Sequence, residues 1–322
     1  MELALQIRPY QFALVRPLQT AAGVINTREG WLLRFQTADG RLGWGEVAPL
    51  QSAHRSACET ALLGLASACS VKSLEHVVSA LPAEVAFGVG SALAELTGWV
   101  GSQSAEDWLA APESAELLPS GMRMLARLDA LLEVMRAGQS LTVKWKVAVE
   151  PDHQERHWLE QLLQKLPPGA QLRLDANGGW DRSTAQAWMD RLVGEPLFAW
   201  LEQPLPPEDQ SGLELLARRG PVALDESLTL SPRLRQQWDG WQVRRPSQEG
   251  DPRPLLQALR SGQPRWMLST AFETGIGRRW LNHLAALQWS GPTPAAPGLA
   301  PGWCPEGPLF SADPEQVWRA SS

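Results

Sequence analysis

The sequence predicts an α/β protein: a (β/α)₇β TIM-like barrel with a smaller α+β capping domain. From about residue 120 onward, short apolar runs alternate with amphipathic helical segments, and repeated βα units of this kind build a parallel sheet. Seven such units exceed what a small doubly wound sheet requires and suit a closed barrel. The segment before about residue 95 instead combines a β-hairpin with helices, which is an α+β pattern.

The first elements belong to the expected capping domain. The run "GWLLRFQTADGRLGWGEVAPL" has two β-rich halves around "ADG", which is a hairpin signal, and helix-like stretches follow at about 55–69 and 83–99. We expect the capping domain to span residues 1–95. The C-terminal tail, about 303–322, is expected to complete it, so that the barrel spans 96–302.

The barrel strands are expected in regular order along the rest of the chain. They are residues 122–128, 141–147, 170–176, 198–204, 221–227, 240–246 and 265–271, with an eighth strand or its remnant near 293–301. Asp152 and Asp181 each precede an amphipathic segment and are predicted to cap a helix there.

Composition narrows the class of protein. The chain has 322 residues, 44% of them hydrophobic, and a formal net charge of −6, with lysines and arginines scattered rather than gathered in a basic stripe. No stretch approaches ~18 consecutive apolar residues. Three cysteines without CxxC spacing suit reduced thiols. We therefore expect a soluble cytoplasmic enzyme that binds neither nucleic acid nor membrane; the oligomeric state stays open and includes a monomer.

One expected strand, "LTVKWKVAVE", carries two lysines inside an apolar run. Strand periodicity places Lys144 and Lys146 on one face, with Val143, Trp145 and Val147 on the other. Lysines can guard an exposed edge strand, which is one interpretation. The other is catalytic, because two neighbouring ammonium groups lower each other's pKa and leave one amine able to act as a general base.

Acidic residues end three successive strands of the expected barrel. Asp175, Glu202 and Asp225 each follow an apolar run and are about one βα unit apart. The carboxyl ends of barrel strands form the face on which active sites are built, where three converging carboxylates repel one another without a cation. Each acid could alternatively be an N-cap or loop residue. All three in consecutive units favour an oxygen-only site for Mg²⁺.

Cations flank this acid triplet. The lysine pair lies on the strand before Asp175, and Arg244 and Arg245 end the strand after Asp225. A base beside a Mg²⁺ site suits abstraction of a proton next to a carboxylate, where the metal stabilises the negative charge that develops. A small-molecule carboxylate is therefore the expected substrate.

With these residues in place, the chain resembles the o-succinylbenzoate synthase family of the enolase superfamily, in its muconate-lactonizing-like subgroup. The matching segments are "AAGVINTREGW", "GWGEVAPL", "AFGVGSALAEL", "KWK", "LRLDANGGW", "LEQP", "LDES" and "LSTAFETGIG". The resemblance spans most of the chain, and the ordered set of lysine pair, Asp, Glu and Asp is specific to the superfamily.

The resemblance implies roles for individual residues. Lys146 resembles the catalytic base and Lys144 its electrostatic helper, with Arg245 as a further cation. The implied Mg²⁺ ligands are Asp175, Glu202 and Asp225. The remaining implied site residues are Asn177 and Glu226, which orient the ligands, Thr20 and Gly23 in a loop that closes over substrate, and Ser269 and Thr270, which contact it.

The reaction that the resemblance implies is the Mg²⁺-dependent syn-dehydration of 2-succinyl-6-hydroxy-2,4-cyclohexadiene-1-carboxylate to 2-succinylbenzoate. It makes the chain a carbon–oxygen lyase of menaquinone or phylloquinone biosynthesis. One residue departs from the family: Arg245 stands where most members have a lysine before proline, and arginine does not readily serve as a base. An N-acylamino acid racemase or dipeptide epimerase, an acid-sugar dehydratase and a non-catalytic barrel binding protein are the alternatives.

Overall fold

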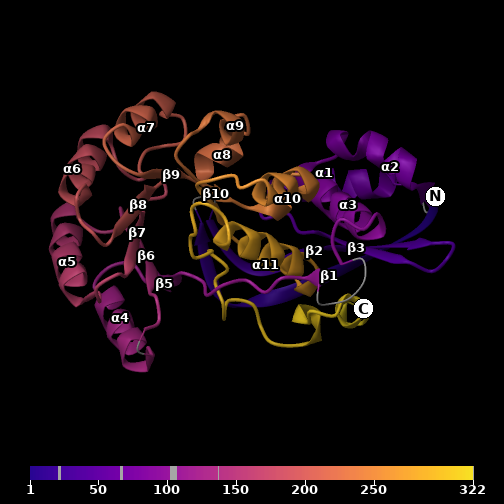
Figure 1. Cartoon of the computed structure of the whole chain (residues 1–322), viewed down its shortest axis with the longest axis horizontal. Coiled ribbons are helices and arrows are strands. Elements are labelled where there is room, and N and C mark those ends of the chain that lie inside the picture. Colours follow the sequence, from indigo (N-terminus) through magenta and orange to yellow (C-terminus); the bar gives the residue numbers. More distant parts are fainter. Residues whose placement is uncertain (21–22, 66–67, 102–106, 137, 322) are drawn as a thin grey trace. The chain divides into compact units, whose positions relative to one another are not determined.

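The computed structural model describes residues 1–20, 23–65, 68–101, 107–136 and 138–321. The chain forms two compact units (Figure 1). The first comprises Met1–Glu113, Arg244–Pro264 and Leu268–Ser322, and the second comprises Ser114–Val243 and Arg265–Met267. The domain bounds at residues 95 and 302 stay a prediction. In the described ranges, no helix is both long and apolar enough to cross a bilayer.

The first unit contains a four-stranded antiparallel sheet. Its order is β3-β2-β1-β4, and its strands are β1 (Glu2–Thr20), β2 (Gly23–Thr37), β3 (Leu42–Val47) and β4 (Ala68–Ser70). The β2–β3 pairing runs from Trp31 opposite Val47 to Gln36 opposite Leu42. The hairpin that was expected around "ADG" is therefore confirmed.

Helices accompany this sheet. They are α1 (Ser52–Gly64), α2 (Val71–Val77), η1 (Val78–Ala80), α3 (Ala83–Leu96), η3 (Pro246–Gln248), α10 (Pro252–Arg260), α11 (Gly275–Trp289), η4 (Pro308–Phe310) and α12 (Pro314–Ala320). Helix α3 lies directly against β3, because a Cβ on Gly45 would come within 2.0 Å of the Gly88 carbonyl oxygen. Glycine at 45 is what allows this approach.

The C-terminal helix packs on the N-terminal sheet. Val317 and Trp318 of α12 share an apolar cluster with Tyr10 and Trp44, and the Arg8 guanidinium donates to the Trp318 carbonyl at 2.9 Å. This contact buries the apolar face of α12. A helix this short is not stable in isolation, so the packing against the sheet stabilises it.

The second unit contains most of a seven-stranded sheet in the order β11-β10-β9-β8-β7-β6-β5. The strands are β5 (Glu116–Leu118), β6 (Thr142–Lys146), β7 (Gln171–Asp175), β8 (Phe198–Glu202), β9 (Val222–Leu224), β10 (Trp241–Arg244) and β11 (Trp266–Leu268). The ladders from β5 to β10 are parallel. At the expected eighth strand, Gly298 forms a single parallel bridge with Ser269. The α/β barrel class with an antiparallel capping unit is thus confirmed.

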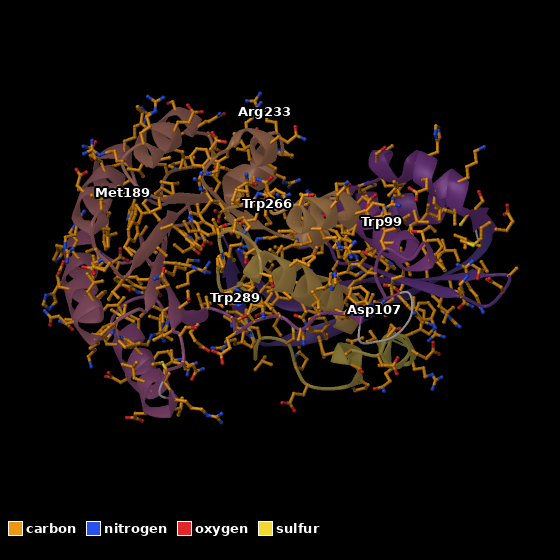
Figure 2. All side chains as sticks on the ribbon, viewed as in Figure 1. Trp99, Asp107, Met189, Arg233, Trp266 and Trp289 are labelled. Atoms are coloured by element: carbon orange, nitrogen blue, oxygen red, sulfur yellow. The ribbon has the colours of Figure 1, made fainter. Side chains whose placement is uncertain are left out.

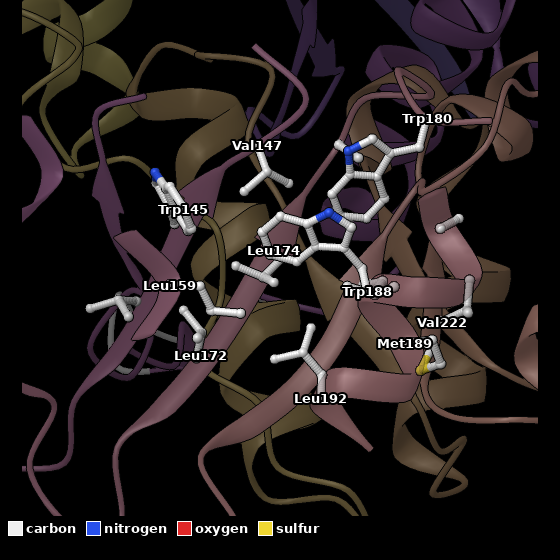
Figure 3. Close-up of a cluster of buried hydrophobic side chains, with 14 of the residues drawn as sticks. Trp145, Val147, Leu159, Leu172, Leu174, Trp180, Trp188, Met189, Leu192 and Val222 are labelled. Carbon is white, nitrogen blue, oxygen red and sulfur yellow. The ribbon is translucent and has the colours of Figure 1, made fainter. Parts of the chain in front are cut away.

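Helices cover one face of this sheet. They are α4 (Arg123–Val134), α5 (Asp152–Lys165), α6 (Arg182–Leu192), α7 (Gln210–Ala217), α8 (Glu226–Leu230) and α9 (Leu234–Gln237). The core between sheet and helices includes Trp145, Leu174 and Trp188, which Figure 3 shows gathered in one cluster. Figure 2 draws the side chains on the same ribbon and labels Met189 of α6. This core buries one side of strands β5 to β9, and on β6 the opposite side carries the polar residues Lys144 and Lys146.

Two local predictions were wrong. Residues 122–128 were expected to form a strand, but most of them lie in α4, because Met124 and Leu128 continue a helical repeat with Leu131 and Leu132. The three-residue β5 precedes this helix instead. Asp152 is the first residue of α5 rather than its cap, which is Pro151, whereas Asp181 caps α6 as expected by accepting from the Thr184 N–H.

Candidate active site

The strand register brings charged side chains to one edge of the sheet. Lys146 pairs with Asp175 across β6 and β7, and Asp175 pairs with Glu202 across β7 and β8. Glu202 in turn pairs with Ala223 of β9, so Asp225 follows two residues later. These four side chains, Lys146, Asp175, Glu202 and Asp225, therefore lie at or just beyond the carboxyl ends of neighbouring parallel strands.

Alternation along β6 separates its lysines from its apolar residues. Val143 and Trp145 are fully buried in the helix-facing core, whereas Lys144 and Lys146 point to the opposite face and are partly exposed. The predicted facing of "KWK" is therefore confirmed. A strand with neighbours on both sides is not an edge strand, so the edge-guarding interpretation of the lysines is wrong.

Lys144 is held by two of the acids. Its Nζ donates to Asp175 Oδ2 at 2.7 Å and to Glu202 Oε1 at 2.8 Å, and its side chain is 23% exposed. Burial disfavours the ammonium, but the two carboxylates outweigh burial and raise the pKa of Lys144. The expectation that the paired lysines lower each other's pKa is thus wrong for Lys144, which stays protonated.

Lys146 differs from Lys144 in the contacts of its amine. Among the described residues, its Nζ makes no hydrogen bond or ion pair. The loop that follows is held by Glu155 of α5, a fully buried carboxylate that accepts from the backbone N–H groups of residues 148, 149 and 150 at 2.9 to 3.0 Å. Ala148 has a φ of 61°, which is uncommon for a residue with a Cβ. The strand end is fixed while the amine of Lys146 remains available.

The acids are buried close to one another. Burial raises the pKa of Glu202; Lys144 opposes this rise, and the carboxylates of Asp175 and Asp225 add to it. Among the described residues, Glu202 Oε2 is buried without a hydrogen-bond partner. A buried oxygen of this kind calls for a ligand, and an all-oxygen donor set suits a hard divalent cation.

Asn177 and Glu226 support these acids. The Asn177 N–H donates to Asp175 Oδ1 at 3.2 Å, and its Nδ2 donates to Glu226 Oε1 at 3.0 Å. Burial, followed by the charges of Asp225 and Asp175, raises the pKa of Glu226 to about 7. Within the described ranges, no three Asp, Glu, His or Cys side chains already form a closed cage, and the Lys144 ammonium contacts both Asp175 and Glu202.

Arg245, Ser269 and Thr270 form a separate cluster in the first unit. Arg245 Nη1 donates to Ser269 Oγ at 3.0 Å and to the Thr270 carbonyl at 2.8 Å. The Thr270 hydroxyl donates to the buried carboxylate of Glu273 at 2.6 Å. Gly23 is exposed with a φ of 123° and its backbone pairs with Thr20; the side chain of Thr20 and residues 21–22 lie outside the described residues.

Another buried cation was missed from the sequence. Arg173 pairs with Lys144 across β6 and β7, and its guanidinium lies 4.1 Å from the ring centroid of Trp200. Burial lowers the pKa of Arg173 to about 9, which the charge of Glu202 opposes. The available signal was its position two residues before Asp175, because strand periodicity places both on one face.

Known proteins are similar to this chain over most of its length. Residues 5–96 match the family described as MenC, N-terminal domain, and residues 127–238 match the family described as Enolase C-terminal domain-like. An o-succinylbenzoate synthase of Thermosynechococcus vestitus is 35% identical over 297 residues, which cover 87% of each chain. The chain belongs to the o-succinylbenzoate synthase family.

Solved structures agree with this membership. An o-succinylbenzoate synthase from Thermosynechococcus elongatus BP-1, complexed with Mg in the active site, is 32% identical with a TM-score of 0.82, and the match covers 98% of this chain and 99% of that one. The L-Ala-D/L-Glu epimerase from Bacillus subtilis is 20% identical with a TM-score of 0.66, over 92% and 90% of the two chains. The second likeness shows the shared fold.

Proposed function

We propose that this chain catalyses the Mg²⁺-dependent syn-dehydration of 2-succinyl-6-hydroxy-2,4-cyclohexadiene-1-carboxylate to 2-succinylbenzoate, as a hydro-lyase of menaquinone or phylloquinone biosynthesis. Membership of the o-succinylbenzoate synthase family supports the reaction. One observation supports the roles of individual residues: Lys144 is held by two carboxylates, while Lys146 on the same face of β6 has a free amine among the described residues.

Asp175, Glu202 and Asp225 are the proposed Mg²⁺ ligands. The unpartnered Glu202 Oε2 and the oxygen-only donor set fit this ion, and the related Thermosynechococcus elongatus enzyme is complexed with Mg. Asn177 and Glu226 orient the ligands through their hydrogen bond and the contact to Asp175. When bound, the ion supplies Lewis-acid stabilisation of negative charge on the substrate carboxylate.

Lys146 is the proposed general base. It takes the proton from the carbon beside the carboxylate, and the electrons of that C–H bond form the new ring double bond as the C–O bond breaks. The protonated amine then returns its proton to the departing hydroxide, so that water leaves from the same face. One base is sufficient for this syn-elimination, and aromatisation of the ring provides the driving force.

Lys144, which stays protonated, supplies fixed positive charge to Asp175 and Glu202. For Arg245 we propose a second fixed positive charge, with Ser269 and Thr270 as substrate contacts. The hydrogen bonds within this cluster support the proposal, because they hold the guanidinium in one orientation. We also propose Thr20 and Gly23 as substrate-binding residues.

The decisive test uses purified protein, the cyclohexadiene carboxylate and Mg²⁺, with formation of the aromatic product followed by ultraviolet absorbance. We expect turnover that a chelator abolishes and added Mg²⁺ restores. If the wild type binds neither Mg²⁺ nor the carboxylate, the chain is a protein that has lost this chemistry.

A racemase or epimerase needs a base on each face of the carbanion. Arginine is a poor base, so Arg245 argues against this alternative. In heavy water, only Lys146 is expected to exchange the α-proton of a single N-acylamino acid enantiomer, and this exchange retains the configuration at the α-carbon. Rapid racemisation by the wild type would instead favour the two-base activity.

We also propose a cytoplasmic location. The three cysteines, Cys58, Cys69 and Cys304, are free thiols in the structure, which suits a reducing compartment. Fractionation of the native host, with the protein followed by antibody, tests this location.

A further inference from the structure

The residue after Glu202 makes four side-chain hydrogen bonds. Gln203 is fully buried, and its Nε2 donates to Ser227 Oγ at 2.7 Å and to the Leu205 carbonyl at 3.0 Å. Its Oε1 accepts from the backbone N–H groups of Ser227 at 3.0 Å and of Asp225 at 3.2 Å. One amide therefore joins the end of β8 to the end of β9.

The backbone of Gln203 extends this connection to β7. Its N–H donates to the Ala223 carbonyl at 2.8 Å, and its carbonyl accepts from Gly178 at 2.7 Å, three residues after Asp175. Gln203 has a φ of 37°, a conformation that a residue with a Cβ adopts only where its surroundings impose it. Gln203 thus bonds to the loop that follows Asp175, to Leu205 in its own loop, and to Asp225 and the start of α8.

Three carboxylates at one edge of a sheet repel one another. The Lys144 ammonium offsets part of this repulsion at Asp175 and Glu202, and the hydrogen bonds of Gln203 hold the backbone that follows Glu202 against the backbone at Asp225. A carboxamide suits this position because it presents an acceptor toward two N–H groups and a donor toward a carbonyl and a hydroxyl. A glutamate would set a carboxylate oxygen against the Leu205 carbonyl, and a methionine could make none of the four hydrogen bonds.

We propose that Gln203 is a positioning residue that sets the separation of Glu202 and Asp225 and thereby the affinity of the site for its divalent cation. The inference rests on the proposed function, because it takes these two acids as cation ligands. Gln203 acts through the backbone and contacts neither substrate nor cation.

Gln242 of β10 offers a matched control. It is also a buried glutamine whose Nε2 bonds two backbone carbonyls, those of Arg235 at 3.2 Å and Trp238 at 3.0 Å. These carbonyls belong to α9 and to its C-cap, not to the segments that carry the three acids. A general loss of stability affects both variants, whereas a change in cation affinity is expected at position 203 alone.

The experiment titrates Mg²⁺ into the substrate-free wild type, Gln203→Met and Gln242→Met by calorimetry, with urea unfolding of each protein without metal. We expect Gln203→Met to weaken Mg²⁺ binding by about 10- to 100-fold, as is typical when a group that orients a ligand is removed. Gln242→Met is expected to lose comparable stability and to keep wild-type affinity. Turnover of Gln203→Met is expected to recover as Mg²⁺ is raised, so the defect lies in the Mg²⁺ requirement more than in kcat.

The outcomes separate the two proposals. If the wild type binds Mg²⁺ and turns over substrate, and Gln203→Met binds Mg²⁺ with equal affinity, the positioning role is overturned and the proposed function stands. If the wild type binds no Mg²⁺, both proposals are overturned. If Gln203→Met does not fold, Ser227→Ala removes a single partner of the amide; a several-fold weaker Mg²⁺ affinity supports the role, and unchanged affinity overturns it.

Discussion

The Lys144 ammonium lies 2.7 Å from the Asp175 carboxylate, one strand away. It also contacts Glu202, so one cation neutralises part of an acidic cluster before any metal binds. This pairing predicts how the metal-free protein depends on Lys144.

Lys144→Met is expected to destabilise the metal-free protein by less than the roughly 3–5 kcal/mol typical of broken buried ion pairs, because Lys144 keeps 23% exposure. Mg²⁺ should stabilise this variant more than it stabilises wild type, since the ion then replaces the missing charge. Thermal melts with and without Mg²⁺ measure the difference. Equal Mg²⁺ stabilisation of the two proteins would show that the ammonium and the metal act on different groups.

Asp175→Asn, Glu202→Gln and Asp225→Asn are expected to abolish turnover and to weaken Mg²⁺ binding strongly, while the fold persists because each change relieves like-charge repulsion. Calorimetry and circular dichroism check affinity and folding. A variant that kept wild-type activity without Mg²⁺ would remove its residue from the proposed ligand set.

Lys146→Ala is expected to lose turnover at every pH while it keeps Mg²⁺ affinity. Lys144 cannot replace the missing base, because the neighbouring carboxylates raise its pKa and hold it protonated. Rate profiles across the neutral and alkaline range, with Mg²⁺ titrations, check both points. Residual activity that rises toward wild type at alkaline pH would mean that Lys144 can serve as a base.

Glu155→Gln is expected to destabilise the protein by about 1–3 kcal/mol, because three backbone N–H groups lose a charged acceptor. Turnover should fall as well, since the loop follows Lys146. Glu160 on the same helix is a suitable control: it is 49% exposed and pairs with Arg191, so Glu160→Gln should change stability by less than about 0.5 kcal/mol. Urea unfolding of both variants makes the comparison, and equal losses would contradict the anchoring role.

His283 predicts a stability change with pH in the first unit. It is buried on α11, its Nδ1 accepts from the Leu109 N–H at 3.2 Å, and burial, with the charge of Arg260, lowers its pKa to about 4. Because the folded protein favours the neutral imidazole, His283 makes its full contribution to stability above its unfolded-state pKa near 6.5. This contribution is lost as pH falls toward the folded-state pKa of about 4. The loss should reach on the order of 2 kcal/mol near about pH 5.

His283→Gln keeps an acceptor for Leu109 and removes the titration. Urea unfolding at about pH 7.5 and about pH 5 should therefore show a smaller pH-dependent loss in this variant than in wild type. Equal losses in the two proteins would assign the pH dependence to other groups.

Strand periodicity was sufficient to place several site residues. In "LTVKWKV", alternation separates Lys144 and Lys146 from Trp145, and the observed burial follows the same alternation. An acid after each of three apolar runs was likewise visible in the sequence. The same local reasoning failed at 122–128, because two methionines at alternate positions look like a strand until the helical repeat through Leu132 is included.

By itself, the sequence determined which residues end the strands and which face of each strand they share, because these properties depend on neighbours along the chain. Tertiary structure alone decided that Lys144 reaches Asp175 and Glu202, that Arg173 stacks on Trp200, and that Gln203, at the end of β8, bonds to residues that follow β7 and β9. These contacts depend on register between strands that are tens of residues apart. A change of one residue in that register would turn every side chain to the opposite face.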